Sequence, residues 1–330
     1  MAGDPRMGTL VVASAGGDAQ AQQVISQRDR TDKGVVFLWT GSRDAKAGLG
    51  LLKNARIPVF YTPDMLARGL RSRLAYHTWR ERRLADGFAS APSRTAVQDE
   101  AIAQAVGLGR QTLSESESKR LLAAWGVESA REVLVGSAEA AVSAAPQIGF
   151  PVALKVDSPD ILHKTEAGVV RLNLREAAQV REAYVEILAS AKAYAPQARI
   201  TGVSVQEMVG DGVEVIVGAS CDPQLGPVLL FGSGGVMVEV YNDVALRRCP
   251  ITRLEAQAMI AEVKGARLLR GFRGRPAADV EALEDTLVSV SYLAMHMGGQ
   301  LAELDINPLM VLPSGRGVRA ADALIVLRET

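Results

Sequence analysis

Three oxygen-bearing side chains alternate along one stretch near the C-terminus. Glu303, Asp305 and Asn307 occur in the sequence ELDINP, with apolar residues between them. Successive side chains of a β-strand point to opposite faces, so these three would share one face, and a returning strand could bring Asp322 opposite them. Clustered carboxylate and amide oxygens repel one another unless a cation is present, and Mg²⁺ carrying bound phosphates is a suitable cation. The tight spacing favours a metal site over the alternative, a solvated polar face on an edge strand.

A lysine interrupts an otherwise apolar strand at residues 151–156, PVALKV. Because burying an unpaired ammonium group is costly, the side chain of Lys155 must reach a polar partner. A phosphate group would be a good partner. The strand by itself is also compatible with a lysine that extends along the apolar surface to the sheet edge.

A further polar group lies where a later strand ends. Gln206, Glu207 and Met208 close that strand, and Glu214 follows on the next one. Backbone groups at such a hinge can bind the edge of an adenine ring, and a nearby carboxylate can bind ribose hydroxyls. Glutamate at a strand end is common, so this pattern supports a nucleotide site only in combination with the other two.

The first part of the chain is expected to form a small parallel α/β unit. Apolar runs at residues 9–13, 34–39 and 57–61 are bounded by turn residues, as buried parallel strands are, and helix-like segments separate them. This order is typical of an open parallel sheet. Three strands are few for a free-standing domain, so we expect residues 1–80 to be the end of a larger one, followed by a linker at 81–112.

A second domain is predicted for residues 113–330. It starts at a capping box formed by Ser114 and Glu117, which begins a helix that ends at Trp125. Two strands are expected to be joined by a hairpin-like turn at residues 210–212, GDG. Strands are predicted at 151–156, 169–174, 202–209, 213–219, 228–231, 301–312 and 317–327, and helices at 176–194, 254–263 and 280–297.

Five separate motifs extend through this second domain. They are SPDILHKTEAG at 158–168, QEM at 206–208, GPVLLFGSGG at 226–235, DVALR at 243–247 and ELDINPL at 303–309. Together they resemble the ATP-grasp domain of ADP-forming (NDP-forming) acyl-CoA synthetases, which are related to succinyl-CoA synthetase. The first hundred residues resemble the last part of that family's second CoA-ligase domain. The resemblance implies a partial Rossmann- or flavodoxin-like parallel α/β unit followed by a two-subdomain ATP-grasp fold.

The resemblance also implies a role for each matching residue. Lys155 would contact the phosphates of ATP, Arg247 would lie near them, and His163 would take part in relaying the phosphoryl group. The alternative for His163 is a histidine that caps its loop. The implied nucleotide-binding residues are Lys155, Gln206, Glu207, Met208, Glu214, Gly232, Gly234 and Gly235, and the implied metal ligands are Asp305, Asn307 and Asp322.

The implied reaction joins a carboxylic acid to coenzyme A (CoA) and converts ATP to ADP and phosphate. ATP, Mg²⁺ and CoA would be needed, and the phosphoryl group would pass through a phosphohistidine and an acyl phosphate. The family's first CoA-binding domain and its swinging-loop histidine do not match any part of these 330 residues. We therefore expect a partner domain or subunit that carries them, and an oligomeric assembly.

Composition narrows the classes of function. The chain has 37 basic and 37 acidic residues and a net charge of zero, so it has no basic field for nucleic acid or an anionic membrane. Two cysteines in a chain of this length do not form a disulfide framework, so a reducing, cytoplasmic setting is expected. No apolar run approaches the roughly 18–20 residues that span a bilayer.

Two other classes of function remain open at this point. One is a regulatory or non-catalytic module that binds ATP and Mg²⁺ without turnover. The other is a different ATP-grasp ligase, which would join an acid to an amine. A Rossmann dehydrogenase is disfavoured, because Gly16 and Gly17 do not form the G-x-G-x-x-G pattern.

Overall fold

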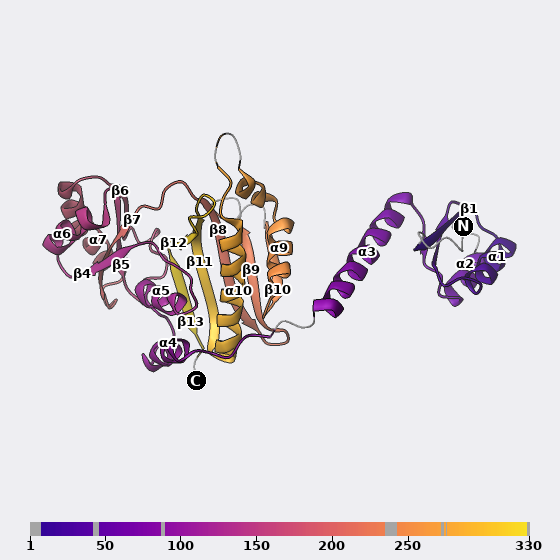
Figure 1. Cartoon of the computed structure of the whole chain (residues 1–330), viewed down its shortest axis with the longest axis horizontal. Helices are drawn as coiled ribbons and strands as arrows, with labels where there is room; N and C mark the ends of the chain where they lie inside the picture. The colour runs from indigo at the N-terminus through magenta and orange to yellow at the C-terminus, as the bar shows by residue number, and fades with distance from the viewer. Residues whose placement is uncertain are drawn as a thin grey trace. The chain divides into compact units, whose positions relative to one another are not determined.

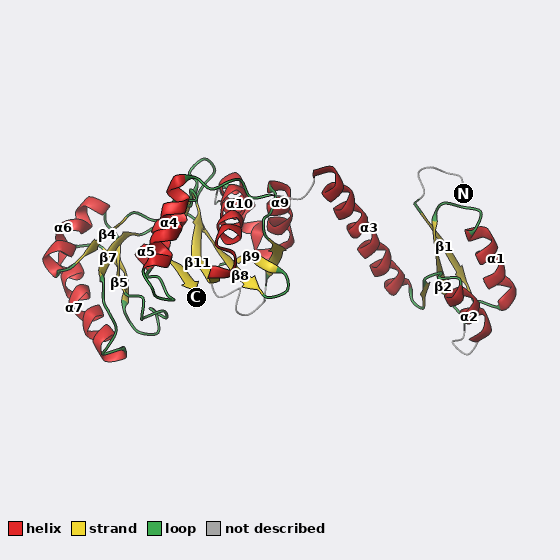
Figure 2. Ribbon diagram, turned by 90° about the horizontal axis from the view of Figure 1, so that it is seen from below, coloured by secondary structure: helices red, strands yellow, loops and turns green. Residues whose placement is uncertain are grey.

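The computed structural model describes residues 8–41, 46–86, 90–234, 243–271, 274 and 276–328. The chain divides into two compact units, residues 1–88 and 89–330. Figures 1 and 2 show the elements of each unit. Among the described residues, no helix combines the length and the apolar character needed to cross a bilayer.

The first unit is built around a three-stranded parallel sheet in the order β1-β2-β3. Its central strand is the most apolar, and Phe37 and Trp39 from that strand are buried against Leu52 and Ile57. Gly16 lies against Trp39 with φ +82°, and a Cβ atom there would come within 2.2 Å of the indole ring, so only glycine fits. The elements are β1 (Thr9–Ser14), α1 (Asp18–Arg28), β2 (Gly34–Trp39), α2 (Lys46–Asn54), β3 (Val59–Phe60) and α3 (Pro63–Asp86).

The second unit contains two antiparallel sheets with separate apolar cores. The four-stranded sheet has the order β4-β7-β5-β6, and helices α6 and α7 pack against one of its faces (Figures 1 and 2). Its elements are β4 (Glu132–Val135), α6 (Ala138–Ile148), β5 (Val152–Asp157), β6 (Val170–Leu174), α7 (Ala177–Tyr194) and β7 (Gly202–Glu207).

The six-stranded sheet has the order β10-β9-β8-β11-β12, and β13 also pairs with β11. Helix α10 packs against its central strands, and α9 packs against β10. Its elements are β8 (Val213–Asp222), β9 (Gly226–Ser233), β10 (Val244–Arg248), α9 (Arg253–Glu262), the 3₁₀ helix η1 (Lys264–Arg270), α10 (Val280–Met297), the 3₁₀ helix η2 (Gly298–Gln300), β11 (Leu301–Val311), β12 (Val318–Ala320) and β13 (Ala323–Leu327).

Two helices precede these sheets in the chain, α4 (Ala96–Gly107) and α5 (Glu115–Ala123). Helix α5 begins at the predicted capping box: the Ser114 hydroxyl accepts from the Glu117 amide, and the Glu117 side chain accepts from the Ser114 amide. In both views α5 lies between the two sheets (Figures 1 and 2). This position lets its first turn contact residues from both.

The architecture agrees with the α/β class and the two-subdomain organisation expected from the sequence. The expected linker at 81–112 contains α4, whose Ile102 and Ala105 pack into the larger core of the second unit.

The predicted hairpin at residues 210–212 is wrong, because β7 pairs with β4 and β5 whereas β8 pairs with β9 and β11. Turn residues mark a change of chain direction, but they do not determine which strands pair, and here the segment crosses from one sheet to the other.

The last predicted strand, at 317–327, is interrupted. The structure divides it into β12 and β13, with Ala321 and Asp322 between them. This break turns the Ala321 carbonyl toward Lys155 and Gln206 of the four-stranded sheet, and the Asp322 side chain toward Lys155 and the loop between β5 and β6.

Candidate active site

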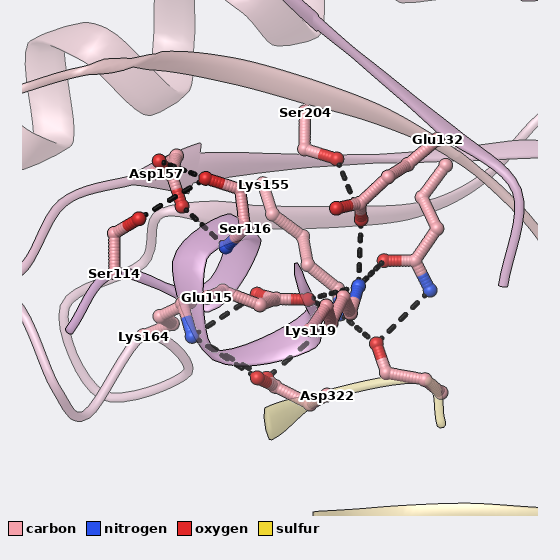
Figure 3. A network of polar contacts seen from close by, with 12 residues as sticks. Ser114, Glu115, Ser116, Lys119, Glu132, Lys155, Asp157, Lys164, Ser204 and Asp322 are labelled. Carbon is pink, nitrogen blue, oxygen red and sulfur yellow. Dashed lines mark hydrogen bonds and ion pairs between the residues drawn. The ribbon is translucent and has the colours of Figure 1, made fainter. Parts of the chain in front are cut away.

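A buried carboxylate in the first turn of α5 joins three lysines (Figure 3). Glu115 is 4% exposed. Its Oε1 atom lies 2.7 Å from Lys119 Nζ and 3.0 Å from Lys155 Nζ, and its Oε2 atom lies 3.1 Å from Lys164 Nζ. Burial alone would raise the pKa of Glu115, but the three ammonium groups outweigh burial and hold the pKa well below its usual range. Glu115 is therefore an anion at neutral pH in the folded protein.

The first of these lysines comes from the middle of β5. Every residue of that strand is buried, including Lys155. Besides Glu115, its Nζ atom donates to the Ala321 carbonyl at 2.7 Å and lies 3.8 Å from Asp322 Oδ2. Lys155 thus does not extend to the sheet edge. It crosses from the four-stranded sheet to the break between β12 and β13.

The second lysine comes from the loop between β5 and β6. Lys164 Nζ lies 3.2 Å from Asp322 Oδ1 and 3.5 Å from Asp322 Oδ2, in addition to its contact with Glu115. Burial lowers its pKa, but the charges of Asp322 and Glu115 have the larger combined effect and raise the pKa above the usual lysine value. Sequence reasoning missed this residue, although it directly follows His163 in one of the five motifs.

The third lysine extends the network to the edge of the four-stranded sheet. Lys119 Nζ donates to Glu132 Oε2 at 2.6 Å and to Gln206 Oε1 at 3.1 Å. The Gln206 amide in turn donates to the Ala321 carbonyl at 3.0 Å. Sequence reasoning missed Glu115, Lys119 and Glu132, since their partners are distant in the chain. The only local signal was the four-residue spacing of Glu115 and Lys119 on one helix.

The predicted row of oxygen-bearing side chains is present on β11. Glu303 and Asn307 are exposed and Asp305 is half-buried, whereas Leu304 and Ile306 are buried on the other face. Burial, followed by the charges of Glu303 and Asp322, raises the pKa of Asp305 to about 6.

The returning chain also lies where the sequence suggested. The Asn307 amide donates to the Asp322 carbonyl at 3.2 Å. The pairing of β11 with β8 shifts by one residue between Ile306 and Leu309, which is a β-bulge at Asn307 and Pro308. The structure therefore brings Asp305 and Asn307 of β11 together with Asp322, which lies in the break between β12 and β13.

These residues fit a magnesium ion. Their donors are carboxylate and amide oxygens, which Mg²⁺ prefers. Burial is the main cause of the raised pKa of Asp305, and the charges of Glu303 and Asp322, which a divalent cation would offset, add to it. Within the described part of the chain, no three His, Cys, Asp or Glu side chains are grouped so that they could hold a metal by themselves. A metal here would therefore depend on the Asn307 amide, on water or on a phosphate oxygen.

The expected adenine hinge is bonded within the protein. The Glu207 carboxylate accepts from the Arg131 amide at 2.9 Å and from Arg131 Nε at 2.7 Å. The Glu207 amide donates to the Arg131 carbonyl, and the Met208 amide donates to the Pro151 carbonyl at 3.3 Å. These contacts fix the path of the segment after β7.

Gly234, which directly follows β9, lies beside Glu214. The Gly234 amide donates to the Glu214 carbonyl at 2.9 Å, and a Cβ atom at position 234 would lie 2.6 Å from the Glu214 backbone. This close approach explains why a glycine is needed. Gly232 pairs with residues of β8 and β10, and Gly235 lies outside the described residues.

The two expected catalytic residues lie in different surroundings. Arg247 is on the edge strand β10, separated from β11 by β9 and β8, and forms an ion pair with Glu262 at the end of α9. His163 is exposed in the loop between β5 and β6, next to Lys164. The structure thus places His163, but not Arg247, beside the lysine network.

Comparison with known proteins identifies the family to which this chain is related. The family model described as "ATP-grasp domain" matches residues 104–327. The beta subunit of acetate–CoA ligase [ADP-forming] II from Pyrococcus furiosus is 40% identical over 227 residues, which are 69% of this chain and 96% of that protein. The chain belongs to the ATP-grasp family of ADP-forming acyl-CoA ligases.

Two further relatives show the extent of the match. Acetate–CoA ligase [ADP-forming] I from Archaeoglobus fulgidus is 38% identical over 299 residues, covering 90% of this chain and 43% of that longer protein. The chain thus spans less than half of this relative. A solved structure of acetyl-coenzyme A synthetase 1 from Ca. Korarchaeum cryptofilum, in complex with coenzyme A and Ca-AMPCP, is 41% identical with a TM-score of 0.65. It covers 69% of this chain and 99% of the solved one.

Proposed function

We propose that this chain supplies the nucleotide site of an ADP-forming acid–CoA ligase, which converts a carboxylic acid, CoA and ATP to an acyl-CoA, ADP and phosphate. The observation that carries the proposal is the set of lysines that meets the Asp322 carboxylate between the two sheets. Lys155 and Lys164 offer cations for phosphate oxygens, and Asp322 is adjacent to the oxygens of Asp305 and Asn307. Matched relatives are named as acetate–CoA ligases.

Each part of the site has a task in this proposal. Lys155 and Lys164 bind the phosphates and offset the charge that develops during phosphoryl transfer. Asp305, Asn307 and Asp322 would hold Mg²⁺, which would offset the negative charge of the phosphate oxygens. Gln206, Glu207, Met208 and Glu214 border the adenosine, and Gly232, Gly234 and Gly235 allow close approach of the backbone.

His163 is the proposed phosphoryl acceptor. A ring nitrogen attacks the γ-phosphorus, the bond from phosphorus to the bridging oxygen breaks, and ADP leaves with the electron pair. Its exposed position on a loop suits a side chain that must meet the nucleotide and then a second reactant. The phosphoryl group next passes to the carboxylate, and the CoA thiol displaces phosphate from the acyl phosphate.

The remaining steps require groups from elsewhere. We propose that a CoA-binding domain or subunit carrying a swinging-loop histidine joins this chain in an oligomer in the cytoplasm. Separate beta subunits among the relatives support a division of this kind. We assign residues 1–80 to the end of a CoA-ligase domain, 81–112 to a connecting segment and 113–330 to the ATP-grasp domain.

The test is phosphorylation of the purified chain with γ-labelled ATP and Mg²⁺. The wild type should acquire acid-labile, base-stable label, and His163→Ala and Asn307→Ala should not. His77→Ala is the matched control, because His77 is an exposed histidine on α3, and it should keep the label.

Two other outcomes would change the assignment. If ADP binds but no label forms, the accepting histidine belongs to the partner, or the chain binds nucleotide without turnover. If equilibrium dialysis detects no binding of ADP or ATP, the proposed function is wrong.

A further inference from the structure

We propose that Lys164 is an internal counterion that occupies Asp322 until a magnesium nucleotide replaces it, and that this exchange frees the loop that carries His163. The inference rests on the proposed nucleotide site and assigns a positioning role to a residue within it. Asp322, the carboxylate expected to bind a metal, is already in contact with the Lys164 ammonium, so the two cations are in conflict.

The contacts define that conflict. Lys164 Nζ lies 3.2 Å from Asp322 Oδ1 and 3.5 Å from Oδ2, and Lys155 Nζ is 3.8 Å from Oδ2. The side chain of Lys164 is 11% exposed, whereas that of Asp322 is 29% exposed. A metal could therefore approach Asp322 from the solvent side, but it would have to share the carboxylate with an ammonium group.

The charges of the network are already balanced. Its lysines are Lys119, Lys155 and Lys164, and the carboxylates that pair with them are Glu115, Glu132 and Asp322. A divalent cation arriving alone would add two positive charges beside Lys164 and meet repulsion. A cation arriving with phosphates brings negative oxygens that give the displaced ammonium a new partner.

Lys164 is better suited to move than Lys155. Lys155 belongs to β5, which is hydrogen-bonded to β6 and β7, and it is also held by the Ala321 carbonyl. Lys164 belongs to a loop whose side-chain anchors to the rest of the site are its ion pairs with Glu115 and Asp322. Displacing it requires no strand pair to break.

The same loop links this displacement to His163. The Ala167 amide donates to the His163 carbonyl at 3.0 Å, and the Val169 amide donates to the Lys164 carbonyl at 3.1 Å. These bonds make residues 163–169 a compact turn, so a movement of Lys164 carries His163 with it. Occupation of the metal site thereby controls where the accepting histidine lies.

The test measures binding of Mn²⁺ alone by electron paramagnetic resonance, with the full chain and no nucleotide. Lys164→Met removes the competing cation, so Mn²⁺ should bind roughly tenfold tighter than to the wild type, the effect of one charge at a partly screened site. Lys192→Met is the control for loss of a lysine charge outside the network: Lys192 is exposed on α7, so the Mn²⁺ affinity of this variant should match the wild type.

A second measurement uses the wild type and does not depend on how the variants fold. Trace acetylation read by mass spectrometry should label Lys164 several-fold faster when Mn²⁺ saturates the site, with no such change at Lys119. Unchanged Mn²⁺ affinity in Lys164→Met, or unchanged labelling of Lys164, would show that Lys164 is not displaced from Asp322 by the metal, even if ADP binds normally. Failure of the wild type to bind ADP would instead overturn the proposed function.

Discussion

Replacing Glu115 with glutamine removes one charge from the centre of the lysine network. The carboxylate is 4% exposed and contacts three ammonium groups at 2.7–3.1 Å. Removing one member of a buried ion pair costs about 3–5 kcal/mol, because the remaining charge is left without its partner. Lys119 and Lys164 retain Glu132 and Asp322, so we expect Glu115→Gln to lower the free energy of unfolding of the second unit by about 3 kcal/mol.

The assay is urea unfolding followed by hydrogen exchange in peptides from α5 and β5, which report the second unit alone. Glu139→Gln is the matched control, because Glu139 forms an exposed ion pair with Arg181 at 2.8 Å. Such a pair contributes about 0–1 kcal/mol, so this variant should unfold nearly as the wild type does.

The pH dependence identifies the charge as the cause. The folded-state pKa of Glu115 is depressed below the ordinary value of 4.5, so its contribution is fully present above that pH and declines as the pH falls toward the folded-state pKa. The difference in unfolding free energy between wild type and Glu115→Gln should therefore be constant from pH 6 to 8, because this pH range lies above both the unfolded-state and the folded-state pKa of Glu115. The difference should shrink below about pH 4.5. A difference that stays constant down to pH 3.5, or one no larger than that of Glu139→Gln, would refute the reasoning.

Two further substitutions test the glycine contact and the alternation of β11. Gly234→Ala places a Cβ atom 2.6 Å from the Glu214 backbone, and the backbone shift needed to relieve this clash costs about 1–3 kcal/mol. The shift should weaken ADP binding roughly tenfold in a fluorescence titration. Gly136→Ala, where a Cβ atom meets nothing within 4 Å, should bind ADP normally, and equal affinities for the two variants would contradict the role of the contact. Leu304→Ala, at a fully packed position, should lower the unfolding free energy by about 2–5 kcal/mol, whereas Glu303→Ala on the exposed face should change it by about 0.5 kcal/mol or less. Thermal unfolding of both variants checks this, and similar losses would mean that the faces of β11 are assigned wrongly.

Much of the fold could be predicted because local patterns carry it. The capping box at Ser114 and the alternating residues of β11 depend on neighbours within a few positions, and the structure has both. The elements that were missed lack such signals. Helix α6 contains Pro146 in an alanine-rich run, and β4 has only four residues, with Val133 and Leu134 exposed.

The site was less predictable from the sequence for a related reason. Lys155 could be singled out because a charge in an apolar strand needs a partner. Its actual partners, Glu115 and the Ala321 carbonyl, are 40 and 166 positions away in the chain. Residues such as Lys119 and Lys164 look like ordinary surface lysines until folding brings three segments together.

The Ala321 carbonyl connects the two sheets of the second unit. It accepts hydrogen bonds from Lys155 and Gln206, which belong to adjacent strands of the four-stranded sheet. Since this acceptor is a backbone atom, no substitution at position 321 removes it. The position can therefore accept any residue type that keeps the same backbone path. A change in length is different. One residue inserted or deleted between β12 and β13 displaces the carbonyl and Asp322 together by about 3.3 Å, the rise of one strand residue. Natural variation in this family should therefore tolerate many residue types at position 321 but hardly any change in the length of the junction.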